Sequence, residues 1–135
     1  MSEILVIAEH RGGELRPVSL ELIAAANELK ASTGSTVAVA LIGADAASFT
    51  GAVSVDGVDE IVTVATNSAN FQPDEWAAAV TALIEARSSS LVLLPHSVDS
   101  WGFAPALGAT GNYGFATDVF GIAQDGGEWI ATRAM

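Results

Sequence analysis

Residues 4–8 read Ile-Leu-Val-Ile-Ala, five consecutive apolar side chains near the start of a chain of 135 residues. A strand that is covered on one face alternates apolar and polar residues, whereas a strand that is covered on both faces is apolar throughout. The run therefore predicts a strand buried on both faces, which is typical of a parallel sheet between two layers of helices.

Similar apolar runs recur along the chain and alternate with helical patterns. Further strands are predicted at residues 37–42, 61–65, 91–94 and 119–123. Helices are predicted at residues 19–32, 45–53, 73–87 and 101–109. A polar loop at residues 9–17 follows the first strand, and a short returning strand around Trp129 follows a turn at residues 125–127. Because parallel crossovers are right-handed, the alternation predicts an α/β fold, a Rossmann-like doubly wound parallel sheet in strand order 3-2-1-4-5 within a single three-layer domain.

The helix at residues 73–87 has the clearest sequence pattern. Pro73 stands in the first turn, where its missing N–H costs nothing, and Arg87 complements the negative end of the helix dipole. One face repeats at helical spacing and consists of Trp76, Ala79, Val80, Leu83 and Ile84. We expect this face to pack into the core.

The charge balance excludes two classes of partner. Sixteen acidic residues against five basic ones give a net charge of −11, and a surface of that sign repels phosphate backbones and anionic lipids. We therefore expect no nucleic-acid partner and no membrane partner. The chain has no cysteine, and its first residues lack the pattern of a signal peptide, which together predict a cytoplasmic protein without disulfides.

In a sheet of this order, the ligand crevice lies at the carboxyl ends of the first and fourth strands. The candidate crevice residues in the two loops are His10, Arg11, His96 and Asp99. Neither loop carries a glycine motif for phosphates, no side chain completes a triad, and a metal site would need further ligands. We therefore expect no catalytic, cofactor-binding or metal-binding residue. The histidines are expected to be loop or interface residues. Arg11 is expected to be a solvated loop residue or to form a salt bridge with Glu9 or Glu14, and Asp99 or Ser100 to be a helix N-cap.

A cluster of aromatic residues forms a second candidate site. The candidate interface residues are Trp101, Phe103, Tyr113 and Phe115. Four large aromatic side chains in an uncharged segment indicate a surface that is covered. The sequence leaves open whether the cover is the domain's own core or another polypeptide.

Several segments together resemble one known family. They are residues 4–10, 13–15, 57–61, 91–123 and 131–133. Within the fourth segment, the step from Gly102 to Pro105 before a small-residue helix and Ala116-Thr117-Asp118 ahead of the fifth strand are the most specific parts. These segments are similar to the N-terminal domain of the α subunit of electron transfer flavoprotein, and the likeness covers nearly the whole chain.

The resemblance implies that residues 1–135 are the N-terminal, adenine-nucleotide-hydrolase-like domain of that subunit. Such a domain belongs to an electron carrier rather than an enzyme. It pairs with a β subunit, and the heterodimer works between flavin dehydrogenases and a further acceptor. In the family, FAD is held mainly by a following domain, so the resemblance implies no cofactor in this chain and FAD in a full family member.

A free-standing nucleotide-binding α/β protein of the universal-stress-like type is the alternative. Such a protein needs a glycine-rich phosphate loop after the fourth strand, where helix N–H groups could hold the phosphates. Residues 95–100 contain no glycine. The sequence therefore favours the pairing domain.

Overall fold

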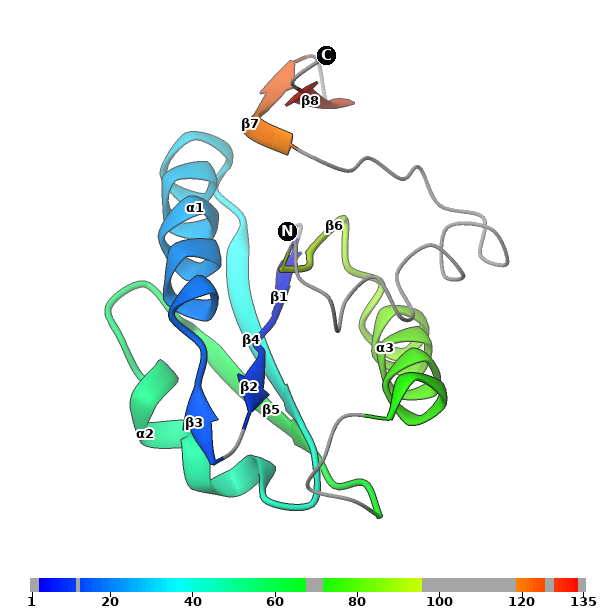
Figure 1. The fold of residues 1–135 in the computed structure, drawn as a ribbon. Helices are drawn as coiled ribbons and strands as arrows, with labels where there is room; N and C mark the ends of the chain where they lie inside the picture. Colours follow the sequence, from blue (N-terminus) through cyan, green and yellow to red (C-terminus); the bar gives the residue numbers. More distant parts are fainter. Residues whose placement is uncertain (1–2, 12, 68–71, 96–118, 126–127, 134–135) are drawn as a thin grey trace.

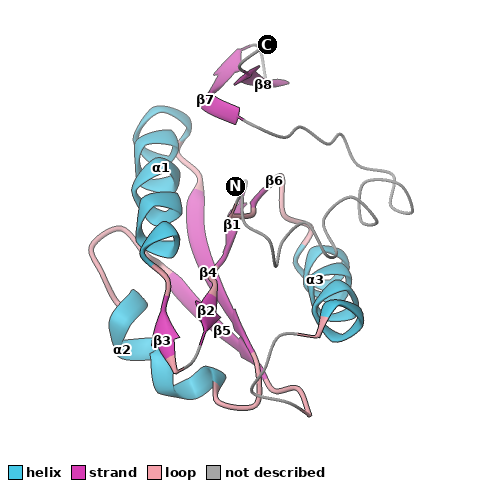
Figure 2. Cartoon of the chain, viewed as in Figure 1, coloured by secondary structure: helices cyan, strands magenta, loops and turns pink. Residues whose placement is uncertain are grey.

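The computed structural model describes residues 3–11, 13–67, 72–95, 119–125 and 128–133, and it confirms the α/β class. Figure 1 shows α1 (Pro17–Thr33) and α2 (Thr50–Val53) on one side of a parallel sheet and α3 (Pro73–Arg87) on the other. The strands of this sheet are β1 (Glu3–Ile7), β4 (Thr36–Ile42), β5 (Glu60–Val64) and β6 (Leu91–Leu93). The helices therefore cover both faces, as the apolar strands require (Figure 2).

The strand order of the parallel sheet is β5-β4-β1-β6. These four strands are, in the same order, the third, second, first and fourth of the predicted strands. The 3-2-1-4 part of the predicted order is therefore confirmed. Ile4 pairs with Val37 of β4 on one side and with Leu91 of β6 on the other. Residues 4–7 are fully buried. The run that predicts the fold is therefore the central strand.

The predicted position of the fifth strand is wrong. β7 (Val119–Asp125) pairs antiparallel with β8 (Glu128–Arg133), and the two form a separate two-stranded sheet beside α1 (Figure 1). A strand that meets its neighbour across a short turn closes a small loop. Pairing with β8 therefore costs less chain entropy than pairing with β6 across residues 96–118. The predicted helix at residues 101–109 lies outside the described residues.

Two connections carry different structure from that predicted. The polar loop after β1 contains a small antiparallel hairpin of β2 (His10–Arg11) and β3 (Glu14–Leu15). Its turn includes Gly13 with a φ of 80°, a conformation that glycine adopts without strain. The weak helix predicted at residues 45–53 is divided into a 3₁₀ turn, η1 (Ala46–Phe49), and the short α2.

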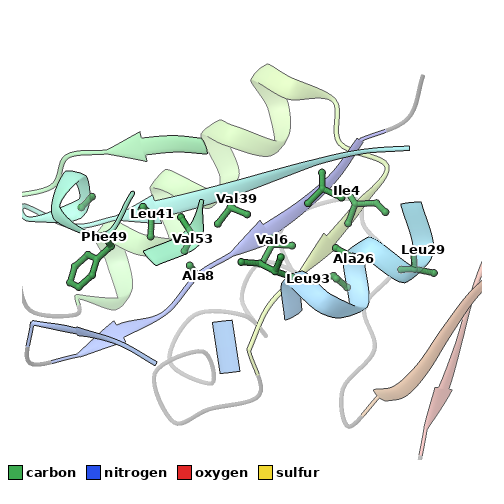
Figure 3. Packing of buried hydrophobic residues seen from close by; sticks show 13 residues of the cluster. Ile4, Val6, Ala8, Ala26, Leu29, Val39, Leu41, Phe49, Val53 and Leu93 are labelled. Atoms are coloured by element: carbon green, nitrogen blue, oxygen red, sulfur yellow. The ribbon is translucent and has the colours of Figure 1, made fainter. Parts of the chain in front are cut away.

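Two hydrophobic clusters join the helices to the sheet. Alternate residues of β1 divide between them, because Ile4 and Val6 face α1 whereas Leu5 and Ile7 face α3. Figure 3 shows the first cluster, in which Phe49 and Val53 extend the contact beyond α1. The apolar face of α3 forms the second cluster, so the prediction that Trp76 belongs to the core is confirmed.

The residues that end α3 and α1 share a left-handed backbone conformation and differ in side chain. Ser88 has a φ of 51° and Gly34 has a φ of 71°. Because this conformation strains a residue with a Cβ, we expect Ser88→Gly to raise the free energy of unfolding by about 0.5–1 kcal/mol in urea. Gly34→Ser is the matched reverse change and should lower it by a similar amount, since no atom lies within 4 Å of a Cβ there. A destabilising Ser88→Gly would contradict this account.

Candidate functional site

The candidate crevice lies where the strand order reverses, at the carboxyl ends of β1 and β6. Of its predicted residues, His10 and Arg11 are described. The predicted crevice residues His96 and Asp99 lie outside the described part of the chain. The same holds for the predicted interface residues, which are Trp101, Phe103, Tyr113 and Phe115. The structure therefore describes the predicted crevice residues that follow β1, and not those predicted after β6.

Glu9, the second residue after β1, is held by backbone and side-chain contacts. The Ser19 hydroxyl accepts the Glu9 N–H at 2.8 Å and donates to the Glu9 carbonyl at 3.0 Å. The same carbonyl accepts the Arg16 N–H at 2.8 Å. The Glu9 carboxylate lies 3.9 Å from the Arg16 guanidinium, with its own side chain buried and that of Arg16 exposed. These contacts fix the exit of β1 against the start of α1.

His10 is buried, with 6% of its surface exposed. Its Nε2 lies 2.6 Å from the carbonyl oxygen of Ile42 at the end of β4, so Nε2 carries the proton and donates it. The ring stacks on Phe49 at a centroid distance of 4.5 Å and lies 5.9 Å from Trp76. The His10 ring thus joins β2 to β4, η1 and α3.

Arg11 has a different environment from its neighbour. It is exposed on β2 and stands opposite Glu14 in the register of the hairpin. A cation and a carboxylate at directly opposite positions of an antiparallel pair are compatible with each other. The hairpin therefore carries its positive charge beside a negative one.

Gly43 gives a direct test of the packing around His10. A Cβ at this position would lie 3.0 Å from His10 Cε1 and 3.3 Å from Asp45 Oδ1, and the φ of 147° is unfavourable for other residues. We expect Gly43→Ala to lower the free energy of unfolding by about 1–3 kcal/mol. In a double-mutant cycle with His10→Ala, the cost of Gly43→Ala should fall by at least about 0.5 kcal/mol, because the obstructing ring is gone. Strictly additive costs would show that Gly43 and the ring are not in contact.

A charged cluster that the sequence patterns do not predict lies at the amino edge of the sheet. Arg87, at the end of α3, donates from Nη2 to Glu3 at 2.7 Å and to Glu60 at 2.6 Å. Ser89 donates to the other oxygen of Glu3 at 2.6 Å. One guanidinium thus joins the first residues of β1 and β5. The predicted alternation of helices and strands could have indicated this cluster, because a helix that leads into a parallel strand ends near the amino edge of the sheet.

The pKa values within this cluster follow from its hydrogen bonds. Burial alone would raise the pKa of Glu3, but the hydrogen bonds from Arg87 and Ser89 and the guanidinium charge outweigh it and lower that pKa. The hydrogen bonds to Glu3 and then to Glu60 raise the pKa of Arg87. Glu3 and Arg87 are therefore charged at neutral pH, and the cluster acts as a structural clamp.

A second ion pair lies at the same edge of the sheet, at the end of α1. Lys30 donates to Asp59 at 2.8 Å and to the Gly57 carbonyl at 3.0 Å. The hydrogen bond from Lys30, followed by that from the Val37 N–H, lowers the pKa of Asp59. This pair is more exposed than the Arg87 cluster.

Two kinds of site are not found among the residues that the structure describes. No group of three or more His, Cys, Asp or Glu side chains there could hold a metal ion. No helix in the same residues is long and apolar enough to span a membrane.

Comparison with known proteins places this architecture in one family. The model of the electron transfer flavoprotein domain matches residues 4–135. The chain is 57% identical over 133 residues to the electron transfer flavoprotein subunit alpha of Methylophilus methylotrophus, covering 98% of this chain and 41% of the relative. It is 26% identical to the alpha subunit of Bacillus subtilis, covering 97% and 40%, and 25% identical to that of Syntrophomonas wolfei, covering 100% and 42%. The chain thus spans about two-fifths of the length of these relatives. It belongs to the electron transfer flavoprotein domain family.

Proposed function

We propose that residues 1–135 are the N-terminal pairing domain of an electron transfer flavoprotein α subunit. The observation that carries the proposal is the 57% identity to such a subunit over nearly the whole of this chain. In this function the domain binds a β subunit, and the heterodimer carries electrons between flavin dehydrogenases and an acceptor in the cytoplasm. The domain itself catalyses no reaction.

The geometry at the end of β1 supports a pairing role over a cofactor site. A flavin or nucleotide needs a deep slot with a few directed polar groups. On the described side of the crevice, the rings of His10, Phe49 and Trp76 pack together, and the polar Nε2 of His10 is used by the Ile42 carbonyl. These groups stabilise the domain and leave recognition to other surfaces.

The proposed contact surface for the β subunit contains Trp101, Phe103, Tyr113 and Phe115. Aromatic side chains are frequent among the residues that dominate binding energy at interfaces. We propose that these four residues meet the β subunit or the remainder of the α subunit.

Co-purification with a tagged β subunit tests this surface. Trp101→Ser and Phe115→Ser should each weaken β-subunit binding by about tenfold or more while the melting temperature stays the same. Leu20→Ser is the matched control, because Leu20 is an exposed apolar residue of α1 with 44% of its surface accessible. Variants that unfold the chain would assign the aromatic residues to its core. Unchanged binding by folded variants would remove the cluster from the interface.

The purified chain is expected to carry no flavin and to bind no adenine nucleotide with micromolar affinity. A phosphate group approaches a domain with a net charge of −11, and only local donors could offset that field. An absorbance spectrum in the near-ultraviolet and blue, followed by titrations with FAD, AMP and ATP, measures this. A yellow protein, or nucleotide binding that Arg11→Ala abolishes, would contradict the pairing-domain proposal and favour the universal-stress-like alternative.

A further inference from the structure

β5 forms one edge of the parallel sheet. Among the described residues it pairs only with β4, on one side. The strand has five residues, contains no proline, and carries a single charge at its first position, Glu60. Natural edge strands are often protected by prolines, bulges, charged side chains or a covering helix or loop. Within its length β5 has no proline and no bulge, and Glu60 is its one charged residue.

The register shows which backbone groups of β5 point outward. Gly43, directly after β4, donates its N–H to the Val64 carbonyl, whereas the Ala40 carbonyl within β4 accepts an N–H from Ala8 on the opposite side of β4. The N–H and C=O groups of a strand residue point to the same side of the strand, and this side alternates from one residue to the next. The N–H and C=O groups of Val62 and Val64 therefore point toward β4. The N–H and C=O groups of Ile61 and Thr63 therefore point away from the sheet.

We propose that this edge pairs with the same edge of a second copy of the chain, giving an antiparallel dimer with its two-fold axis at Val62. In that register, Ile61 of each copy lies opposite Thr63 of the other. Both residues have outward backbone groups, so the two pairs can form four hydrogen bonds.

The side chains of β5 fit this pairing. Ile61 belongs to the face covered by α1, and Val62 and Val64 belong to the face covered by α3. Across the two-fold axis, Ile61 lies beside Thr63, Val62 beside Val62, and Val64 beside Glu60. No like charges lie opposite each other, and Glu60 is already paired with Arg87. A β-branched or apolar side chain therefore lies in every cross-strand pair.

The net charge and the small area make the dimer weak and give it a distinctive salt dependence. Two short strands bury less than the roughly 1,000 Å² of a stable interface, so a dissociation constant of about 0.1–1 mM is expected. Two copies of net charge −11 repel each other. Added salt screens this repulsion without weakening the backbone hydrogen bonds, so association should strengthen with salt.

Hydrogen exchange and sedimentation equilibrium of the intact chain test the proposal. As the protein concentration rises toward about 1 mM, the average mass should rise from that of the 13.7 kDa monomer toward the dimer, more so at high salt. Over the same range the amides of Ile61 and Thr63 should become protected from exchange, whereas Val62 and Val64 should be protected already at low concentration. A monomer at every concentration, or protection that does not change at Ile61 and Thr63, would overturn the proposal.

A proline substitution separates this edge from any other self-associating surface. Thr63→Pro removes an outward N–H that β4 does not use, so it should abolish the dimer and leave the chain folded. Thr63→Ala keeps the N–H and should still dimerise. Association that survives in folded Thr63→Pro would overturn the edge-pairing proposal and leave the proposed β-subunit interface untouched, since the two surfaces are different. If Thr63→Pro unfolds, the exchange of the two outward amides in the unmodified chain decides the question.

Discussion

Replacing Trp76 with alanine is expected to lower the free energy of unfolding by about 3–5 kcal/mol, the range typical of a buried aromatic residue. Trp76 retains only 4% of its surface exposed and lies in the cluster between α3 and the sheet. Its ring also borders the buried ring of His10. The substitution therefore leaves a cavity where α3 meets the end of β1.

Urea unfolding followed by circular dichroism measures this loss. Trp76→Phe keeps an aromatic ring in the cluster and should cost clearly less than the alanine variant. Ala78→Ser, on the exposed side of the same helix, should leave the unfolding curve almost unchanged. A loss of less than about 1 kcal/mol for Trp76→Ala would show that α3 does not pack on the sheet as described.

Replacing Arg87 with methionine is expected to cost about 2–3 kcal/mol at neutral pH. The guanidinium is the shared partner of Glu3 and Glu60, and the side chain of Glu3 is only 16% exposed. Without Arg87, the Glu3 carboxylate is left largely buried, with Ser89 as its remaining side-chain donor. Lys30→Met breaks the more exposed pair with Asp59 and should change the stability far less, which makes it the matched control.

The cost of Arg87→Met should depend on pH in a defined direction. The pKa of Glu3 is lowered in the folded chain, so its ionisation contributes stability above the unfolded value of about 4.3. That contribution is lost as the pH falls through the folded pKa of Glu3. The stability difference between the unmodified chain and Arg87→Met should therefore shrink below about pH 4. A difference that is constant from neutral to acidic pH would contradict the role of Glu3 in the cluster.

The fold is predictable where side-chain pattern and local chain geometry agree. Residues 4–8 indicate a strand buried on both faces, and β1 is central because only a central strand has neighbours on every side. Pro73 and Arg87 mark both ends of α3 correctly. The place of β7 is not predictable in this way, because its apolar run suits an antiparallel hairpin as well as a parallel strand.

Part of the candidate site is likewise predictable from the sequence, and part of it is not. The strand alternation locates the crevice beside His10, but the sequence does not show that this ring lies under Phe49 and donates to Ile42, which are far away along the chain. Arg87 is recognisable as a helix end, yet its pairing with Glu3 depends on how α3 crosses the sheet. Contacts between distant residues follow from tertiary packing, which local pattern does not encode.

Calorimetric titration of the purified chain into a purified electron transfer flavoprotein β subunit tests the proposal that this chain pairs with a β subunit. We expect saturable binding of one chain to one β subunit, with a negative heat-capacity change from buried apolar surface. The Leu20→Ser control should bind equally well, and prior addition of a full-length α subunit should block the titration. Absence of binding to a β subunit that still binds its full-length α subunit would contradict the account.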